Sequence, residues 1–152
     1  MPQTVTITGT RSTDHRPLDE YRRLFKEYLG PFAGPHVQYY IGGAPGIDSL
    51  SLSWLASETD AAITLVVPAR VTDQPADARL AITTVREAGR LSDMVELRGE
   101  ARTSGYHARN RYMVDRSDLV IGFPRSGMPG GGTHYTLDYA TSRNKPRLVV
   151  PV

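Results

Sequence analysis

Three loops of this sequence combine glycine with hydroxyl or charged side chains, a combination that suits the binding of a phosphate group. Glycine lets backbone N–H groups approach a ligand closely, hydroxyls donate hydrogen bonds, and a guanidinium matches the geometry of a phosphate. In the first loop Gly9 is followed by Thr10, Arg11 and Ser12. We predict that Gly9, Thr10 and Arg11 contact a ligand, although the same residues also suit an ordinary strand-to-helix turn.

The second loop holds three glycines within five positions, Gly42, Gly43 and Gly46, and runs directly into a predicted helix. Exposed N–H groups and the positive end of a helix together favour an anion. Asp48 is suited either to cap this helix or to accept a hydrogen bond from a ribose hydroxyl, and both roles stay open. We predict that the three glycines, Ala44 and Asp48 contribute to the ligand site.

The third loop, residues 124–133, contains four glycines and ends in Gly130-Gly131-Gly132-Thr133 directly before a predicted helix. Successive backbone donors at such a helix start form an anion-binding nest. Thr133 is suited either to cap the helix or to bind an oxygen atom of the ligand. We predict that all four residues of this run contact the ligand.

Two common nucleotide-binding patterns are absent from these loops. A Walker A loop needs Gly-Lys-Ser/Thr before its helix, and the dinucleotide fingerprint needs the spacing G-x-G-x-x-G. ATP hydrolysis and hydride transfer are therefore disfavoured, and we predict no bound cofactor. The sequence contains no cysteine, and its four histidines lack metal-ligand spacing such as H-E-x-x-H, so we predict no metal site.

The segment Arg109-Asn110-Arg111 lies within a stretch rich in basic residues. The two arginines could clamp a phosphate bidentately, whereas the alternative for each is a surface ion pair. Asn110 either caps a helix or contacts a base, and we include all three residues in the predicted ligand site. The candidates for catalysis are Arg109, His134 and Asp138, but no Ser/His/Asp spacing surrounds a histidine.

The elements that must position these residues alternate between strands and helices. Short apolar runs predict strands at residues 5–8, 37–41, 63–67, 94–97, 119–123 and 147–150. Helical spacing or loop boundaries predict helices at residues 18–29, 48–56, 76–87, 109–114 and 133–142. We therefore predict an α/β fold, a three-layer Rossmann-like domain with a mostly parallel sheet of 5–6 strands. In such sheets ligands bind outside the carboxyl ends of the strands, which is where the three loops fall.

Length and composition favour a small globular domain. The chain has 152 residues, which is typical of one domain, and we predict a single domain over residues 1–152. Its 18 basic and 16 acidic residues give a formal charge of +2, too balanced to indicate nucleic acid by itself. Its apolar stretches are shorter than the roughly 20 residues of a membrane span, and no signal peptide is visible. We predict a cytoplasmic protein with no membrane partner.

Taken in order, the motifs of this chain resemble the SLOG superfamily, the Rossmann-like group around DNA processing protein A (DprA/Smf) and the LOG phosphoribohydrolases. They look most similar to the small YspA-like, YpsA-related branch. The segments that carry the resemblance cover almost the whole chain: residues 7–11, 42–48, 67–69, 109–113, 118–123 and 131–133. The resemblance implies a nucleotide-related ligand between the glycine loops, with residues 109–111 nearby, and a homodimer or higher homo-oligomer.

The branch decides which function the resemblance implies. DprA-like proteins bind single-stranded DNA in DNA processing and recombination. LOG enzymes hydrolyse the N-glycosidic bond of a nucleotide, and their Arg-x-x-x-Met spacing is matched by Arg109 and Met113. Their Pro-Gly-Gly-x-Gly-Thr-x-x-Glu motif is not matched, because the run from Pro129 to Thr133 is one residue short and Thr136 stands in place of the glutamate.

Three functions remain open at this point. The leading hypothesis is a module that binds a nucleotide or a ribose-phosphate small molecule, for example as a sensor, because the donor-rich loops have no adjacent catalytic pair. The alternatives are a LOG-like hydrolase or transferase acting on the N-glycosidic bond of a nucleotide, and a DprA-like protein that binds single-stranded DNA.

Overall fold

The computed structural model describes residues 2–128 and 130–152, and its centre is a sheet of six parallel strands. The strands are β1 (Thr4–Gly9), β2 (Gln38–Gly42), β3 (Ala62–Val67), β4 (Asp93–Glu96), β5 (Leu119–Phe123) and β6 (Arg147–Val149). Their order across the sheet is β4-β3-β2-β1-β5-β6. The predicted α/β class and Rossmann-like sheet are confirmed, and every observed strand pair is parallel.

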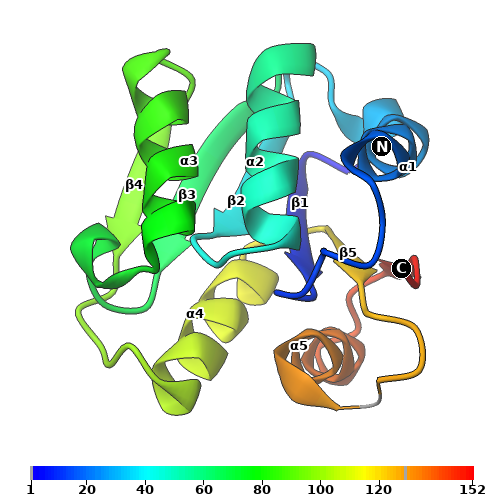
Figure 1. Cartoon of the computed structure of the whole chain (residues 1–152). Coiled ribbons are helices and arrows are strands. Elements are labelled where there is room, and N and C mark those ends of the chain that lie inside the picture. Colours follow the sequence, from blue (N-terminus) through cyan, green and yellow to red (C-terminus); the bar gives the residue numbers. More distant parts are fainter. Residues whose placement is uncertain (1, 129) are drawn as a thin grey trace.

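Five helices cover the two faces of this sheet (Figure 1). They are α1 (Leu18–Tyr28), α2 (Ile47–Glu58), α3 (Ala76–Glu87), α4 (Thr103–Asp115) and α5 (Gly131–Ser142). Contacts join α1 to α2 and α2 to α3, whereas α4 packs against α5. Right-handed crossovers place α1–α3 on one face of the sheet and α4 and α5 on the other, which gives three layers.

The strands present different side chains to the two faces because side chains alternate along a strand. In β1, Val5 and Ile7 belong to the large apolar cluster beneath α1–α3. Thr6 and Thr8 alternate with them and are also buried, and Thr6 shares a hydrogen bond with Ser117 beside α4. One face of the sheet therefore carries an apolar core, while the other carries buried polar groups.

Helices α4 and α5 both begin earlier than predicted. Helix α4 starts at Thr103, before the predicted start at Arg109, and it contains Gly105. A Cβ atom at Gly105 would overlap the carbonyl of Glu100, so the glycine lets the preceding turn pack against the helix. Helix α5 includes Gly131 and Gly132, which the sequence placed in a loop because glycine disfavours helix interiors.

The order in which the strands are added to the sheet reverses between β1 and β5. From β1, strands β2, β3 and β4 follow toward one edge of the sheet, whereas β5 and β6 follow toward the other edge. The loops after β1 and β5 diverge at this switch point, where open α/β sheets bind ligands. The backbone N–H of Thr10 donates to the Phe123 carbonyl over 3.0 Å and that of Ile47 donates to the Thr10 carbonyl over 3.0 Å. These bonds hold the first loop against both β5 and the start of α2.

Candidate functional site

A cavity of about 320 Å³ opens at the switch point, at the lower end of the roughly 300–1,000 Å³ typical of small-ligand pockets. Most of the residues predicted to bind a ligand line it: Gly9, Thr10, Arg11, Ala44, Asp48, Arg109, Asn110, Gly130, Gly131, Gly132 and Thr133. The candidate catalytic residue His134 lines it as well. Pro129, in the third loop, lies outside the described residues.

The remaining predicted residues lie outside the lining of this cavity. Gly43 packs against Val67 and Ile82 in the apolar core. Gly46 has φ +76°, and a Cβ there would lie 2.6 Å from the carbonyl oxygen of Arg11, so this glycine admits the first loop.

Gly42 also lies outside the cavity lining, where it makes room for the two charged groups of the cavity floor. A Cβ atom at this position would overlap the guanidinium of Arg109 and would lie 2.8 Å from Oδ2 of Asp48. A side chain at residue 42 is therefore incompatible with the observed positions of Arg109 and Asp48.

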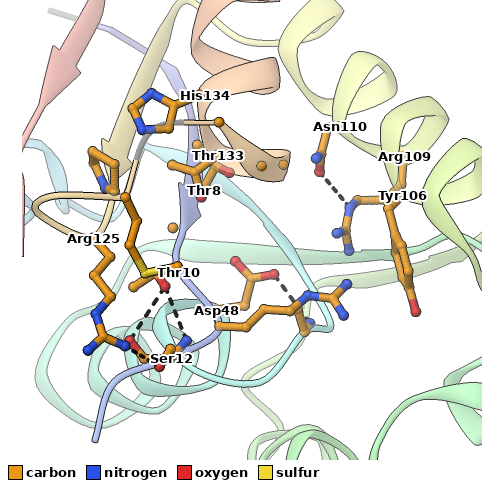
Figure 2. A pocket seen from close by; sticks show the side chains of 18 residues that line it. Thr8, Thr10, Ser12, Asp48, Tyr106, Arg109, Asn110, Arg125, Thr133 and His134 are labelled. Carbon is orange, nitrogen blue, oxygen red and sulfur yellow. Dashed lines mark hydrogen bonds between the residues drawn. The ribbon is translucent and has the colours of Figure 1, made fainter. Parts of the chain in front are cut away.

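The floor of the cavity is formed by Asp48 and Arg109, which are 7% and 4% exposed (Figure 2). Oδ2 of Asp48 accepts from the backbone N–H of Ala44 over 3.2 Å. Nε of Arg109 donates to Oδ1 of Asn110 over 2.7 Å, and Nη1 donates to the carbonyl of Val66 over 3.5 Å. Among the described residues, Oδ1 of Asp48 and Nη2 of Arg109 have no hydrogen-bond partner.

Burial perturbs both charged groups of the floor. Removal from water raises the pKa of Asp48 to about 6, against the opposing effects of Arg109, the Ala44 N–H and Arg11. Removal from water lowers the pKa of Arg109, while Asp48 opposes that change. Each group thus partly compensates the charge of the other, although no direct ion pair joins them in the described part of the chain.

The wall nearest the first loop is a hydrogen-bonded polar cluster that includes Arg125, a residue missing from the sequence prediction. Nη1 of Arg125 donates to Oγ of Ser12 over 2.7 Å, and the backbone N–H of Ser12 donates to Oγ1 of Thr10 over 3.1 Å (Figure 2). Arg125 stands two residues after the end of β5, as Arg11 stands two residues after the end of β1. This equal spacing could have identified Arg125 as a site residue from the sequence.

The opposite wall is the start of α5. Gly130 and Gly131 have φ values of +87° and +85°, which glycine adopts without strain. The helix has no side-chain hydrogen bond at its N-cap, so Thr133 does not cap it. The first N–H groups of a helix lack intrahelical partners, and here they border the cavity next to Thr133.

Tyr106 forms the rim of the cavity between two arginines. The Cζ atom of Arg11 lies 4.3 Å from the centre of the Tyr106 ring, and that of Arg109 lies 5.7 Å from it. Tyr106 is not among the residues predicted to bind the ligand, because an aromatic residue is also typical of a core or an interface, but it lines the cavity. Its position three residues before Arg109 in one helix would have placed both on the same helix face.

Two polar residues predicted near the ligand, Arg111 and Asp138, lie outside the cavity lining. Nη1 of Arg111 donates to the Tyr135 hydroxyl over 2.6 Å, and the Tyr135 ring stacks on His107 with centroids 3.7 Å apart. Asp138 is exposed on α5 outside the cavity lining. The hydroxyl of Thr136, at the position of the LOG glutamate, donates to the Gly132 carbonyl over 2.8 Å.

Residues 2–128 and 130–152 contain neither a metal-binding cluster nor a membrane-spanning helix. No group of three or more His, Asp or Glu side chains in these ranges is arranged to hold a metal ion. No helix in the described chain has both the length and the apolar character of a membrane span.

The fold is that of a Rossmann-like domain, and it carries a cavity at its switch point. Solved structures with this fold include DNA processing protein A from Helicobacter pylori, with a TM-score of 0.71 and 21% sequence identity. The match covers 99% of this chain and 66% of that one. The Helicobacter pylori protein is described as binding single-stranded DNA.

A second similar structure is DNA processing protein A (DprA) from Streptococcus pneumoniae, with a TM-score of 0.67 and 15% identity. The match covers 98% of this chain and 50% of that one. This chain therefore matches between half and two thirds of the length of these two structural neighbours. No family model matches the sequence, and no curated protein matches it.

Proposed function

We propose that this domain binds single-stranded DNA and holds one nucleotide of the strand in the switch-point cavity. The observation that carries the proposal is the lining of a single cavity by Arg11, Arg125 and the free N–H groups at the start of α5. Guanidinium groups and helix N-termini are the groups with which proteins position DNA phosphates.

The distribution of charge in the cavity supports a fixed orientation of the nucleotide. The carboxylate of Asp48 on the floor repels a phosphate, and the low dielectric of a buried site strengthens that repulsion. Arg125, Thr133 and the start of α5 lie at the walls, where they favour the phosphate. We therefore assign the phosphate to the walls and the uncharged part of the nucleotide to the floor.

The structural neighbour from Helicobacter pylori is described as binding single-stranded DNA, and it shares the fold of this chain at a TM-score of 0.71. This likeness supports single-stranded DNA over a free nucleotide as the ligand. We also propose that the chain belongs to the small YspA-like branch and that it forms a homo-oligomer.

Fluorescence anisotropy with labelled single-stranded DNA tests this function. We expect the logarithm of the binding constant to fall linearly with the logarithm of the salt concentration, because phosphates bound by the protein release their counterions. Arg11→Ala should reduce affinity about tenfold through the loss of a charged hydrogen bond, and it should lower the salt slope by about one.

Arg22→Ala is the matched control, since Arg22 is exposed on α1 and pairs with Asp19 at 4.0 Å. It removes the same charge outside the cavity lining and should leave the affinity within about twofold, as expected of a screened surface charge. Absence of binding by the folded protein, or equal effects of Arg11→Ala and Arg22→Ala, would contradict the proposal.

A second candidate ligand is a free nucleotide, and the volume of the cavity supports it. About 320 Å³ is enough for one small ligand, and the buried floor closes the cavity at one end. Direct titrations of the protein with mononucleotides and with labelled DNA separate the two candidates. If mononucleotides bind and DNA of any length does not, the free nucleotide is the ligand.

A further inference from the structure

Two polar atoms on the cavity floor form no hydrogen bond within the described protein, although the residues that carry them are largely buried. Oδ1 of Asp48 accepts no hydrogen bond, and Nη2 of Arg109 donates none, although both side chains are less than one-tenth exposed. Both residues line the cavity, so a bound ligand can supply the hydrogen-bond partners that the protein does not.

The two groups offer opposite chemistry side by side. Asp48 offers an acceptor and Arg109 a donor, and both lie against the same α-carbon, that of Gly42. Their complement is an uncharged group that presents hydrogen-bond donors next to an acceptor. A phosphate does not meet this description, because it has no donor when ionised and is repelled by the carboxylate.

In a DNA strand this complement is the base. The deoxyribose of an internal nucleotide has no hydroxyl, since O3′ and O5′ are esterified, so it has no proton to donate to Asp48. Guanine presents two adjacent donors, N1–H and the 2-amino group, beside the acceptor O6. The other three bases present one donor group at such an edge, N3–H in thymine and a single amino group in adenine or cytosine, so only guanine offers a carboxylate two adjacent donor groups.

We propose that Asp48 and Arg109 recognise the base of the bound nucleotide and select guanine. In this arrangement Asp48 accepts from N1–H and the 2-amino group, and Arg109 donates to O6. The inference rests on the proposed binding of single-stranded DNA and adds a base preference to it. A well-placed bidentate contact discriminates against a wrong base about tenfold or more.

Anisotropy titrations with three oligonucleotides test the inference: oligothymidylate, the same strand with one guanine, and the same strand with hypoxanthine in place of that guanine. We expect the guanine strand to bind about tenfold more tightly than oligothymidylate. Hypoxanthine, which lacks the 2-amino group, should lie between them. Equal affinity for all three strands would overturn the inference and leave DNA binding intact, whereas no binding to any strand would remove both proposals.

Two variants separate base recognition from phosphate binding. Asp48→Asn keeps the size of the side chain and an acceptor for the Ala44 N–H but removes the charge, so the guanine preference should disappear. Arg125→Ala should weaken binding of all three strands equally and preserve their ratios, because Arg125 belongs to the wall. Retention of the full preference by folded Asp48→Asn, with thermal denaturation confirming the fold, would overturn the assignment.

Discussion

The two faces of the sheet are built from different side chains, although the same strands supply both. On the α1–α3 face, alternate strand residues such as Ile7, Ile41 and Leu65 join aromatic residues in one large apolar cluster. On the α4–α5 face the buried apolar cluster contains four residues, Val114, Val120, Leu137 and Ala140. The rest of that buried layer includes polar groups, among them Thr6, Ser117 and Arg109.

This difference shows which face is responsible for stability and which for chemistry. Apolar burial drives folding without directional constraints, whereas buried polar groups need partners and contribute little net stability. The α1–α3 face can therefore stabilise the domain, while Asp48 at the start of α2 and Arg109 of α4 stay incompletely paired at the cavity. Three substitutions test this comparison.

The largest effect is expected from Phe25→Ala on the α1–α3 face. Phe25 is 1% exposed and packs edge-to-face on Phe123 with ring centroids 5.5 Å apart. Its truncation leaves a cavity and should lower the free energy of unfolding by about 3–5 kcal/mol. Urea denaturation measures this loss, with Leu80→Ala as control because Leu80 is 69% exposed. A similar loss in both variants would show that the aromatic cluster does not dominate stability.

The next effect, of opposite sign, is expected from Asp48→Asn at the cavity, where α2 begins. The folded-state pKa of Asp48 is about 6, above its unfolded value of 3.8, so the folded protein binds a proton more tightly. The wild-type carboxylate is therefore destabilising at pH 8 by up to about 3 kcal/mol, and this penalty disappears as pH falls from 6 to below 3.8.

Asp48→Asn should consequently raise the melting temperature at pH 8, and its advantage over the wild type should shrink as pH falls through this window. Thermal melts of both proteins between pH 4 and pH 8 measure the difference. A difference that does not change with pH would show that Asp48 is not perturbed in the way its burial indicates.

The smallest effect is expected from Thr6→Val, which keeps the shape of the side chain on the polar face. The substitution removes the hydrogen bond between Thr6 and Ser117, but the Ser117 hydroxyl retains the Met113 carbonyl as an acceptor over 2.8 Å. The free energy of unfolding should fall by about 1 kcal/mol or less. A loss as large as that of Phe25→Ala would contradict the division of roles between the two faces.

Local patterns in the sequence were sufficient to predict the elements and the fold class. The runs at residues 5–8 and 119–123 are short, apolar and followed by glycine or proline, and they became β1 and β5. The helix starts at α4 and α5 were predicted too late, because glycine within a helix is disfavoured locally. At these two helix starts the packing of neighbouring turns determines where the helix begins, and local sequence patterns do not reveal that packing.

The sequence by itself determined the three glycine-rich loops and their place after strands, because glycine content and apolar periodicity are local properties. Only the tertiary structure decided that Gly42 makes room for Arg109, that Arg111 bonds to Tyr135, and that Asp48 lies buried opposite a guanidinium. These are contacts between residues far apart in the chain, and they depend on strand order and helix packing. The perturbed pKa values of Asp48 and Arg109 arise from the burial of both groups, which no local pattern of residues specifies.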